Sequence, residues 1–207
     1  MKALPIFCAL LSTATPTFAR DVGDTSVNLG VSTFGVNLEA AYQINPAIRV
    51  RGALMGGISL DYDENNDDGD FSGTFDLGGA AFLGDYYPGQ SGWRISGGLF
   101  FSNTELSLTG TTDIDGLGSQ SVTATAEFEN KIAPMLSTGY DLAFGRGWSF
   151  NSEIGVIFNG GIDLNIIADN SAIQQDVDDD TDVQDAKGDA DDITVLPYIG
   201  VSLGYRF

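Results

Sequence analysis

The last residues of the chain, LPYIGVSLGYRF (196–207), alternate strictly between apolar and small or polar side chains. The apolar positions are Ile199, Val201, Leu203, Tyr205 and Phe207. Successive side chains of a β-strand point to opposite faces, so a period of two indicates a strand with one apolar and one polar face. The pattern therefore predicts a strand that ends on an aromatic residue.

The same alternation recurs upstream between segments rich in turn residues. It predicts long strands over 48–60, 71–83, 93–101, 128–142, 148–166 and 196–207, with another from Phe34 to Ile44. A short first strand, Thr25 to Val31, turning through Ser32 and Thr33, makes the number even and gives eight strands. A short helical turn around Ile173 and Val177 is the one departure from this rhythm.

The two faces of these strands differ in bulk. One carries Trp, Phe, Tyr, Leu and Ile, and the other carries Gly, Ser, Ala and scattered charges. The interior of a small closed barrel is only just wide enough for side chains, so the bulky set must point outward, and a bilayer supplies the apolar surroundings that it needs. The expected fold is all-β, an eight-stranded antiparallel transmembrane β-barrel.

The connections alternate between short and long. The segments 45–47, 87–92 and 145–147 are tight turns, whereas 61–70, 109–121 and 168–192 are long and polar. In outer-membrane barrels the short turns are periplasmic and the long loops extracellular. With Phe207 in the periplasm, every long loop is expected outside.

Two irregularities interrupt the strands. Pro134 can donate no ladder hydrogen bond, which predicts a bulge or bend. After Phe101 the phase changes, because Leu106 and Leu108 have the opposite parity; either a bulge intervenes or the strand has left the membrane.

Residues 1–19 have the composition of a secretory signal peptide, and 20–207 form the expected barrel domain. Lys2 gives a positive start, residues 3–11 are apolar, and Thr17-Phe18-Ala19 is a small-x-small cleavage site. The single cysteine, Cys8, lies inside this removable segment. Neither a disulfide nor a lipid anchor is therefore expected.

The formal net charge of −20 argues against nucleic acid as a partner, because phosphates need a basic surface. The acids crowd into 61–70 and 176–192. We expect solvated, flexible extracellular loops there. Diffuse binding of divalent cations, or bridging through them to lipopolysaccharide phosphates, is the alternative.

A specific calcium site is not expected. The EF-hand-like spacing that starts at Asp63 has Asp68 in place of the required glycine and Thr74 at the twelfth position, and the spacing from Asp178 fails at Val183. The sequence indicates no metal or cofactor site.

Catalysis is not expected either. The chain contains no histidine and, after processing, no cysteine. Barrel-type hydrolases and acyltransferases use a histidine as general base or as its partner. Carboxylates in solvated loops have no reason to hold the raised pKa that acid catalysis needs.

Charged residues on the thin face are expected to pair across the interior, because an unpaired buried charge is costly. The polar lumen network is predicted to contain Glu39, Arg49, Arg51, Asp76, Arg94, Lys131 and Glu153, and the charges Glu127, Glu129, Asp141 and Arg206 share this face. Such pairing predicts a plugged barrel. The alternative is a narrow pore that favours cations because its mouth is acidic.

Aromatic residues near the strand ends are expected to form interfacial girdles, with ligand stacking as the alternative. They are Tyr42, Tyr86, Tyr87, Trp93, Trp148 and Tyr205.

The final strand and the segment KIAPMLSTGYDLAFGRGWSFNSEIGVIFNGG (131–161) resemble the small OmpA/OmpX-type outer-membrane β-barrels of Gram-negative bacteria, within a poorly characterised group. The resemblance implies that Leu203, Tyr205 and Phe207 form the signal read by the barrel-assembly machinery. It also implies a monomer in the outer membrane, in contact with lipid and lipopolysaccharide. Fold resemblance leaves function open, so we expect a structural or surface-interaction role, with a pore or a soluble periplasmic ligand-binding protein as alternatives.

Overall fold

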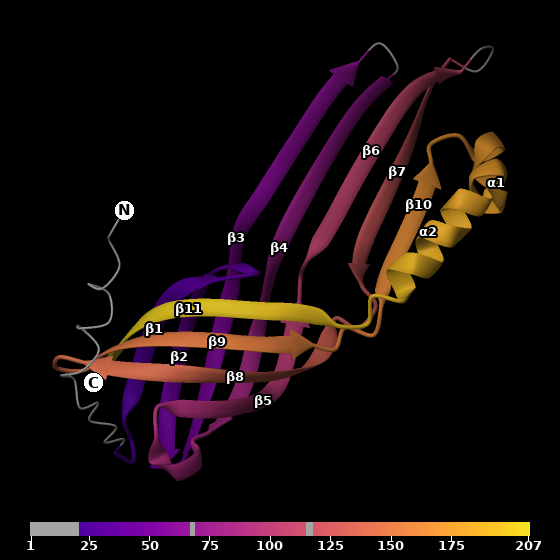
Figure 1. Ribbon diagram of the computed structural model, residues 1–207. Helices are drawn as coiled ribbons and strands as arrows, with labels where there is room; N and C mark the ends of the chain where they lie inside the picture. Colours follow the sequence, from indigo (N-terminus) through magenta and orange to yellow (C-terminus); the bar gives the residue numbers. More distant parts are fainter. Residues whose placement is uncertain (1–20, 67–68, 115–117) are drawn as a thin grey trace, which may run out of the picture.

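The computed structural model of the chain describes residues 21–66, 69–114 and 118–207 (Figure 1). The predicted signal peptide, 1–19, lies outside the described residues. The strands are β1 (Thr25–Ser32), β2 (Gly35–Asn45), β3 (Ile48–Asn66), β4 (Gly69–Tyr86), β5 (Trp93–Ser102), β6 (Glu105–Ile114), β7 (Gly118–Phe128), β8 (Ile132–Phe144), β9 (Trp148–Ile157), β10 (Ile162–Ala168) and β11 (Leu196–Arg206). The helices are η1 (Pro88–Gln90), α1 (Ser171–Asp179) and α2 (Thr181–Asp191).

Eight of these strands close into an antiparallel barrel in the order β1, β2, β3, β4, β5, β8, β9, β11 and back to β1. The pairing of Leu29 with Leu203 joins the first and last strands, and the pairing of Phe82 with Leu99 joins β4 to β5. Closure leaves no strand edge within the barrel. The predicted fold class is confirmed.

One wall of the barrel continues far beyond its rim as an open sheet (Figure 1). β4 pairs with β5 along 79–86 and with β6 along 70–76, so the same strand serves both parts. The external sheet has the order β3, β4, β6, β7, β10. This explains the phase change after Phe101: the chain leaves the barrel at Ser102 and enters the external sheet at Glu105.

Two predicted strands are each divided between the barrel and the external sheet. The segment 128–142 ends β7 at Phe128 and starts β8 at Ile132. The segment 148–166 is broken after Ile157, where Gly160 (φ 84°) and Gly161 (φ 155°) turn the chain out of the barrel. Ile162 then continues the alternation in β10, which pairs with β7.

The three long connections are structured where the chain is described, contrary to the expectation of loops. The first two are strand hairpins, and 168–192 holds α1 and α2. Asp180 accepts hydrogen bonds from the amides of Asp182 and Val183, so an acid of the charged run caps α2. All three connections lie at one end of the barrel, as predicted (Figure 1). Neither α1 nor α2 is long and apolar enough to cross a membrane.

The bulky side chains of the barrel point outward, as the alternation predicted. Phe150, Leu203 and Phe207 are 41%, 52% and 73% exposed, respectively. There are two departures. On β4, Ala81 and Leu83 point inward and Phe82 and Tyr86 outward, and on other strands Phe100, Met135, Ile157 and Tyr198 are buried in the interior. Both faces of β4 are apolar, so alternation could not tell which one is the core face.

Pro134 produces no bulge in its pairing with β5, where β8 keeps an unbroken register from Trp93–Tyr140 to Phe101–Ile132. The β8–β9 ladder begins one residue later, at Met135. Beyond it, Phe158 N donates to the Pro134 carbonyl at 2.9 Å. The predicted irregularity is absent because the missing donor falls at the end of a ladder.

Candidate functional site

The interior of the barrel holds a network of ion pairs centred on two arginines, one on each of the strands that flank β4. From β3, Arg51 Nε lies 3.0 Å from Asp85 Oδ1 and its Nη1 lies 3.4 Å from Glu39 Oε1, while Nη2 contacts Glu153. Arg51 is 2% exposed. Because so strongly buried a charge is stable only when it is paired and hydrogen-bonded, this circuit holds the strands in a fixed arrangement.

Arg94 of β5, on the other side of β4, completes the network. Its Nη1 contacts Asp141, and its Nη2 lies 3.0 Å from Glu153 Oε2. Arg49 Nη2 lies 2.7 Å from Asp85 Oδ2 and its Nη1 lies 3.1 Å from Asp141 Oδ2. The three guanidinium groups therefore share four carboxylates, which leaves one excess negative charge.

Neutral side chains extend the network to the remaining strands. Tyr87 donates to Asp141 at 2.7 Å, and Asn28 donates to Glu39 at 3.2 Å. Asn151 donates to Ser202 of β11 at 3.3 Å. Each strand of the barrel contributes at least one side chain; the contributors are Asn28, Glu39, Arg51, Asp85, Arg94, Asp141, Glu153 and Ser202.

The structure brings together five of the residues named for the lumen network. These are Glu39, Arg49, Arg51, Arg94 and Glu153. Asp76 does not join them, since it is exposed on the external sheet, opposite Glu105. Lys131 lies between β7 and β8 and pairs with Glu127 at 2.7 Å instead. Both residues fall where the chain has already left the barrel, which alternation alone does not reveal.

Sequence reasoning missed Asp85, which contacts all three arginines. It has the parity of Phe75 and Leu83, the bulky face of this segment, which the sequence pattern predicts to point toward lipid. A signal was present, since a carboxylate on the lipid face of a strand is costly. Tyr87 itself is fully buried, so it is not a girdle residue. The other five aromatics of the expected girdle, among them Tyr86 and Trp93 beside the same turn, are exposed.

The remaining charges expected on the thin face lie away from the network. Arg206 Nη1 is 3.4 Å from Asp24 Oδ2 near the chain end, and Glu129 is exposed. The hydrogen bond from Lys131 lowers the pKa of Glu127 and raises that of Lys131. These pairs are peripheral to the barrel interior.

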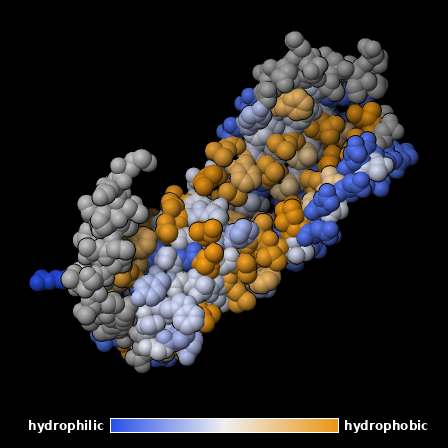
Figure 2. All heavy atoms as spheres, viewed as in Figure 1, coloured by the Kyte–Doolittle hydropathy of each residue, from blue (hydrophilic) through white to orange (hydrophobic). Residues whose placement is uncertain are grey.

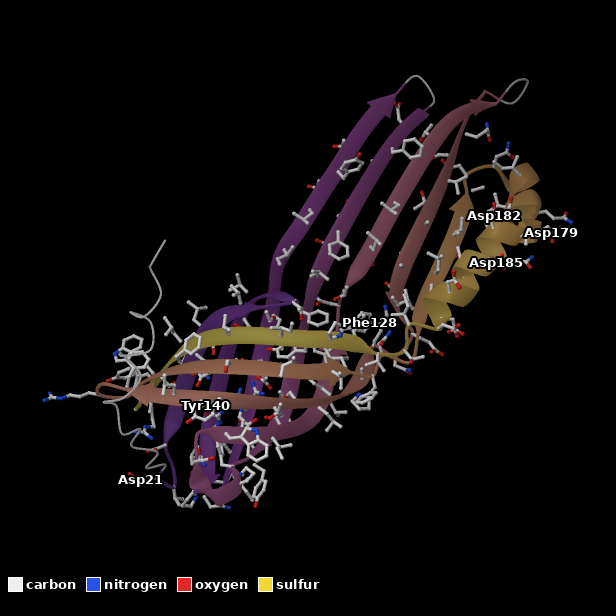
Figure 3. All side chains as sticks on the ribbon, in the orientation of Figure 1. Asp21, Phe128, Tyr140, Asp179, Asp182 and Asp185 are labelled. Carbon is white, nitrogen blue, oxygen red and sulfur yellow. The ribbon has the colours of Figure 1, made fainter. Side chains whose placement is uncertain are left out.

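A second, apolar layer closes the interior at the end that carries the external sheet. Phe34, from the β1–β2 turn, lies with its ring centroid 4.8 Å from that of Phe100 and 6.3 Å from that of Phe128. We call this layer the apolar cap; its other buried members are Ala53, Met55, Ala81, Leu83, Ala133, Met135, Ile157 and Tyr198. Figure 3 shows Phe128 where the barrel meets the external sheet.

Between the two layers lies a cavity with room for about one water molecule. Asn37 and Arg94 are among the residues that line it. Asn37 Oδ1 and Arg94 Nε have no hydrogen-bond partner in the described structure. Buried side chains of the ion-pair network and of the apolar cap thus occupy the described interior on either side of this small space.

The external sheet has one apolar and one polar face. Leu60, Phe75, Leu106, Ala126 and Leu164 form one cross-strand row, and Asp61, Thr74, Ser107, Thr125 and Asn165 form the next. The apolar face continues the barrel interior, because Leu77 and Phe128 of the same face pack with the apolar cap. Figure 2 shows apolar side chains along this face and hydrophilic ones over the helices.

Helices α1 and α2 cover the edge of the sheet at β10. Gln174 accepts a hydrogen bond from Ala168 N at 2.7 Å and donates to the Ile166 carbonyl at 3.2 Å. Asp179, Asp182 and Asp185 line the exposed side of these helices (Figure 3). Within the described ranges, no three acidic side chains are grouped closely enough to hold a metal ion. Part of the spacing from Asp63, at Asp67, lies outside those ranges.

Comparison with known proteins gives a fold but no family. No family model matches the chain, and no curated protein sequence matches it. The crystal structure of Acinetobacter baumannii CarO2 superposes with a TM-score of 0.61 at 16% identity, covering 91% of this chain and 100% of that one. That of A. baumannii CarO gives 0.57 at 17% identity, covering 91% and 98%. At this identity the likeness establishes the barrel architecture, to which this chain conforms over nearly its whole described length.

Proposed function

We propose that this protein is an integral outer-membrane β-barrel whose sealed interior acts as a rigid support for an external sheet that interacts with partners at the cell surface. The outward face of the barrel supports the membrane location, since it carries large exposed apolar side chains on all of its strands, Leu29 and Leu54 among them, and so continuous an apolar surface is suited to a bilayer. Exposed tyrosines and tryptophans near the tight turns fit an interfacial girdle.

The outward face itself indicates where the bilayer ends. On β3 and β4 it changes from Leu54 and Phe82 to Asp61 and Asp76, across an irregularity between Met55 and Ile58. Charged side chains are costly at membrane depth, so the external sheet projects into the extracellular space. The tight turns and both described chain ends then lie on the periplasmic side (Figure 1).

The observation that carries the proposal is the filled interior. A solute would have to part the buried ion pairs around Arg51 and Arg94 and then displace the aromatic rings of the apolar cap. Breaking paired buried charges is unfavourable by several kcal/mol. The barrel is therefore a wall and not a channel, and the surface open to partners is the external sheet.

Electrical recording tests the seal. Purified protein in planar bilayers should give no steady conductance, because a solute path would have to cross two layers of buried side chains. Steady cation-selective channels would overturn the proposal and favour the narrow pore. One observation favours that second function, namely the excess of one carboxylate among the interior charges.

Export and assembly are part of the same proposal. Residues 1–19 would direct secretion, and Leu203, Tyr205 and Phe207 would be read by the barrel-assembly machinery. The mature protein would be a monomer without enzymatic activity, in contact with lipid and lipopolysaccharide, with divalent cations weakly bound at its acidic surface. Membrane fractionation and gel migration with and without boiling test the location. Recovery of folded protein without detergent would contradict it.

A further inference from the structure

The external sheet leaves one long strand edge open. β3 pairs with β2 only as far as Gly56, whereas it pairs with β4 from Ile58 to Asn66. Beyond the barrel rim, β4 is thus the only strand beside β3 within the described sheet, and β3 forms its outer border in Figure 1. The opposite border is treated differently, because α1 and Gln174 cover the edge at β10.

The open edge presents alternating chemistry. Ile58, Leu60 and Tyr62 lie on the apolar face, and Leu60 and Tyr62 are 61% and 57% exposed. Asp61 and Asp63 point to the polar face and are exposed. A strand added here would stand in line with β2, above the β1–β2 turn. Its side chains would extend both faces of the sheet.

Charge decides which kind of strand fits. A second copy of this chain would meet β3 in antiparallel orientation about a two-fold axis. If the two-fold axis passes through Asp61, the two Asp61 residues of the pair lie opposite each other. If it passes through Tyr62, Asp61 of each copy lies opposite Asp63 of the other. Like charges directly opposite each other are destabilising. A strand with basic residues at these positions is complementary instead.

We propose that the β3 edge from Ile58 to Asp63 is a docking site for an extended segment of another protein that alternates apolar and basic residues and adds to the external sheet as a further strand. Backbone hydrogen bonds supply the affinity, the apolar side chains continue the row at Leu60, and the basic ones pair with Asp61 and Asp63. This inference rests on the proposed role of the external sheet as a surface for partners.

A labelled nine-residue peptide of alternating valine and lysine tests the proposal, using full-length protein in phosphatidylcholine nanodiscs and fluorescence anisotropy. The peptide should bind saturably. A peptide of the same composition with its valines and lysines in two blocks should bind at least tenfold more weakly. Two further peptides carry N-methyl groups on the backbone nitrogens of either the odd or the even residues. One of them should lose binding and the other should keep it, because only one edge of an added strand faces β3.

The protein variant Asp61→Lys/Asp63→Lys should weaken binding at least tenfold, whereas Asp179→Lys/Asp185→Lys, with the same charge change on the helices, should not. Heat-dependent gel migration checks that both variants fold. The proposal would be overturned if the alternating peptide did not bind, if the block peptide bound equally well, or if both methylated peptides lost binding equally. Asp61 and Asp63 would then serve only to prevent edge-to-edge aggregation. Bilayer conductance is a separate readout, so failure of the seal and failure of this site are distinguishable.

Discussion

At the scale of single residues, the charges expected on the thin face fall into two groups: buried ion pairs inside the barrel and exposed ion pairs outside it. Arg94 is 2% exposed and pairs with Asp141 and Glu153, whose side chains are 8% and 4% exposed. Lys131 forms an equally close pair with Glu127 but is 66% exposed. Buried pairs leave an uncompensated charge when one partner is removed, whereas exposed pairs contribute little.

Substituting Arg94→Met should therefore destabilise the barrel by about 3 to 5 kcal/mol, because two buried carboxylates each lose one of their two guanidinium partners. Urea unfolding in lipid vesicles, followed by tryptophan fluorescence, measures the change. Lys131→Met is the matched control and should leave the unfolding midpoint unchanged. Equal effects of the two substitutions would show that solvent reaches the interior ion pairs as it does the exposed pair at Lys131.

At the scale of elements, the two borders of the external sheet differ: the edge at β10 is covered, and the edge at β3 is open. Strand edges expose backbone groups that invite pairing, and proteins commonly cover them. The side-chain amide of Gln174 occupies the free donor of Ala168 and the free acceptor of Ile166, which lets α1 close the edge at β10. The edge of β3 has no such cover in the described structure.

Replacing Gln174→Ala should accelerate hydrogen exchange at the Ala168 amide by about two- to tenfold, the equivalent of one hydrogen bond of roughly 0.5 to 1.5 kcal/mol. Exchange at barrel amides should not change. Gln184→Ala is the control, since Gln184 donates to the exposed Asp178 carbonyl on the helices and not to β10. Unchanged protection of Ala168 in the Gln174 variant would contradict an edge-covering role for this side chain.

At the scale of the whole molecule, one sheet passes through two environments. Within the barrel its outward face is apolar and its inward face mixed, whereas beyond the rim the outward face is polar and the face continuing the interior is apolar. The irregularity between Met55 and Ile58, with Gly57 at φ 81°, marks the change on β3. A change of the outward face from apolar to polar along the same strands is what a sheet that passes from bilayer to water requires.

Leu203→Arg should cost about 2 to 4 kcal/mol in folding free energy if the barrel belt lies in hydrocarbon, as expected for a charge near the midplane. Leu108→Arg places the same charge at a similarly exposed position, 49% against 52%, but on the external sheet. It should have a much smaller effect in the same vesicle unfolding assay. Similar costs at both sites would contradict the proposed membrane boundary.

The sequence by itself determined the barrel, because a period-two pattern with one bulky face admits few closed architectures. The number of strands in the barrel, the shared end of the long connections and the outward direction of Phe150, Leu203 and Phe207 all followed from that pattern, whereas β6, β7 and β10 were not predicted as separate strands. Five of the expected network residues also meet in the interior, since charges on a thin face have nowhere else to pair.

Only the tertiary structure decided which strands stay in the barrel. A barrel wall and an open sheet show the same alternation. The pattern therefore could not reveal that Phe128, Asp76 and Lys131 lie outside the barrel wall. The pattern places Leu83 outward because both faces of β4 are apolar. The true direction of Leu83 and Asp85 is set by residues of other strands, such as Phe100 and Arg51. Local pattern fixes the strand, whereas long-range pairing fixes its neighbours and therefore the site.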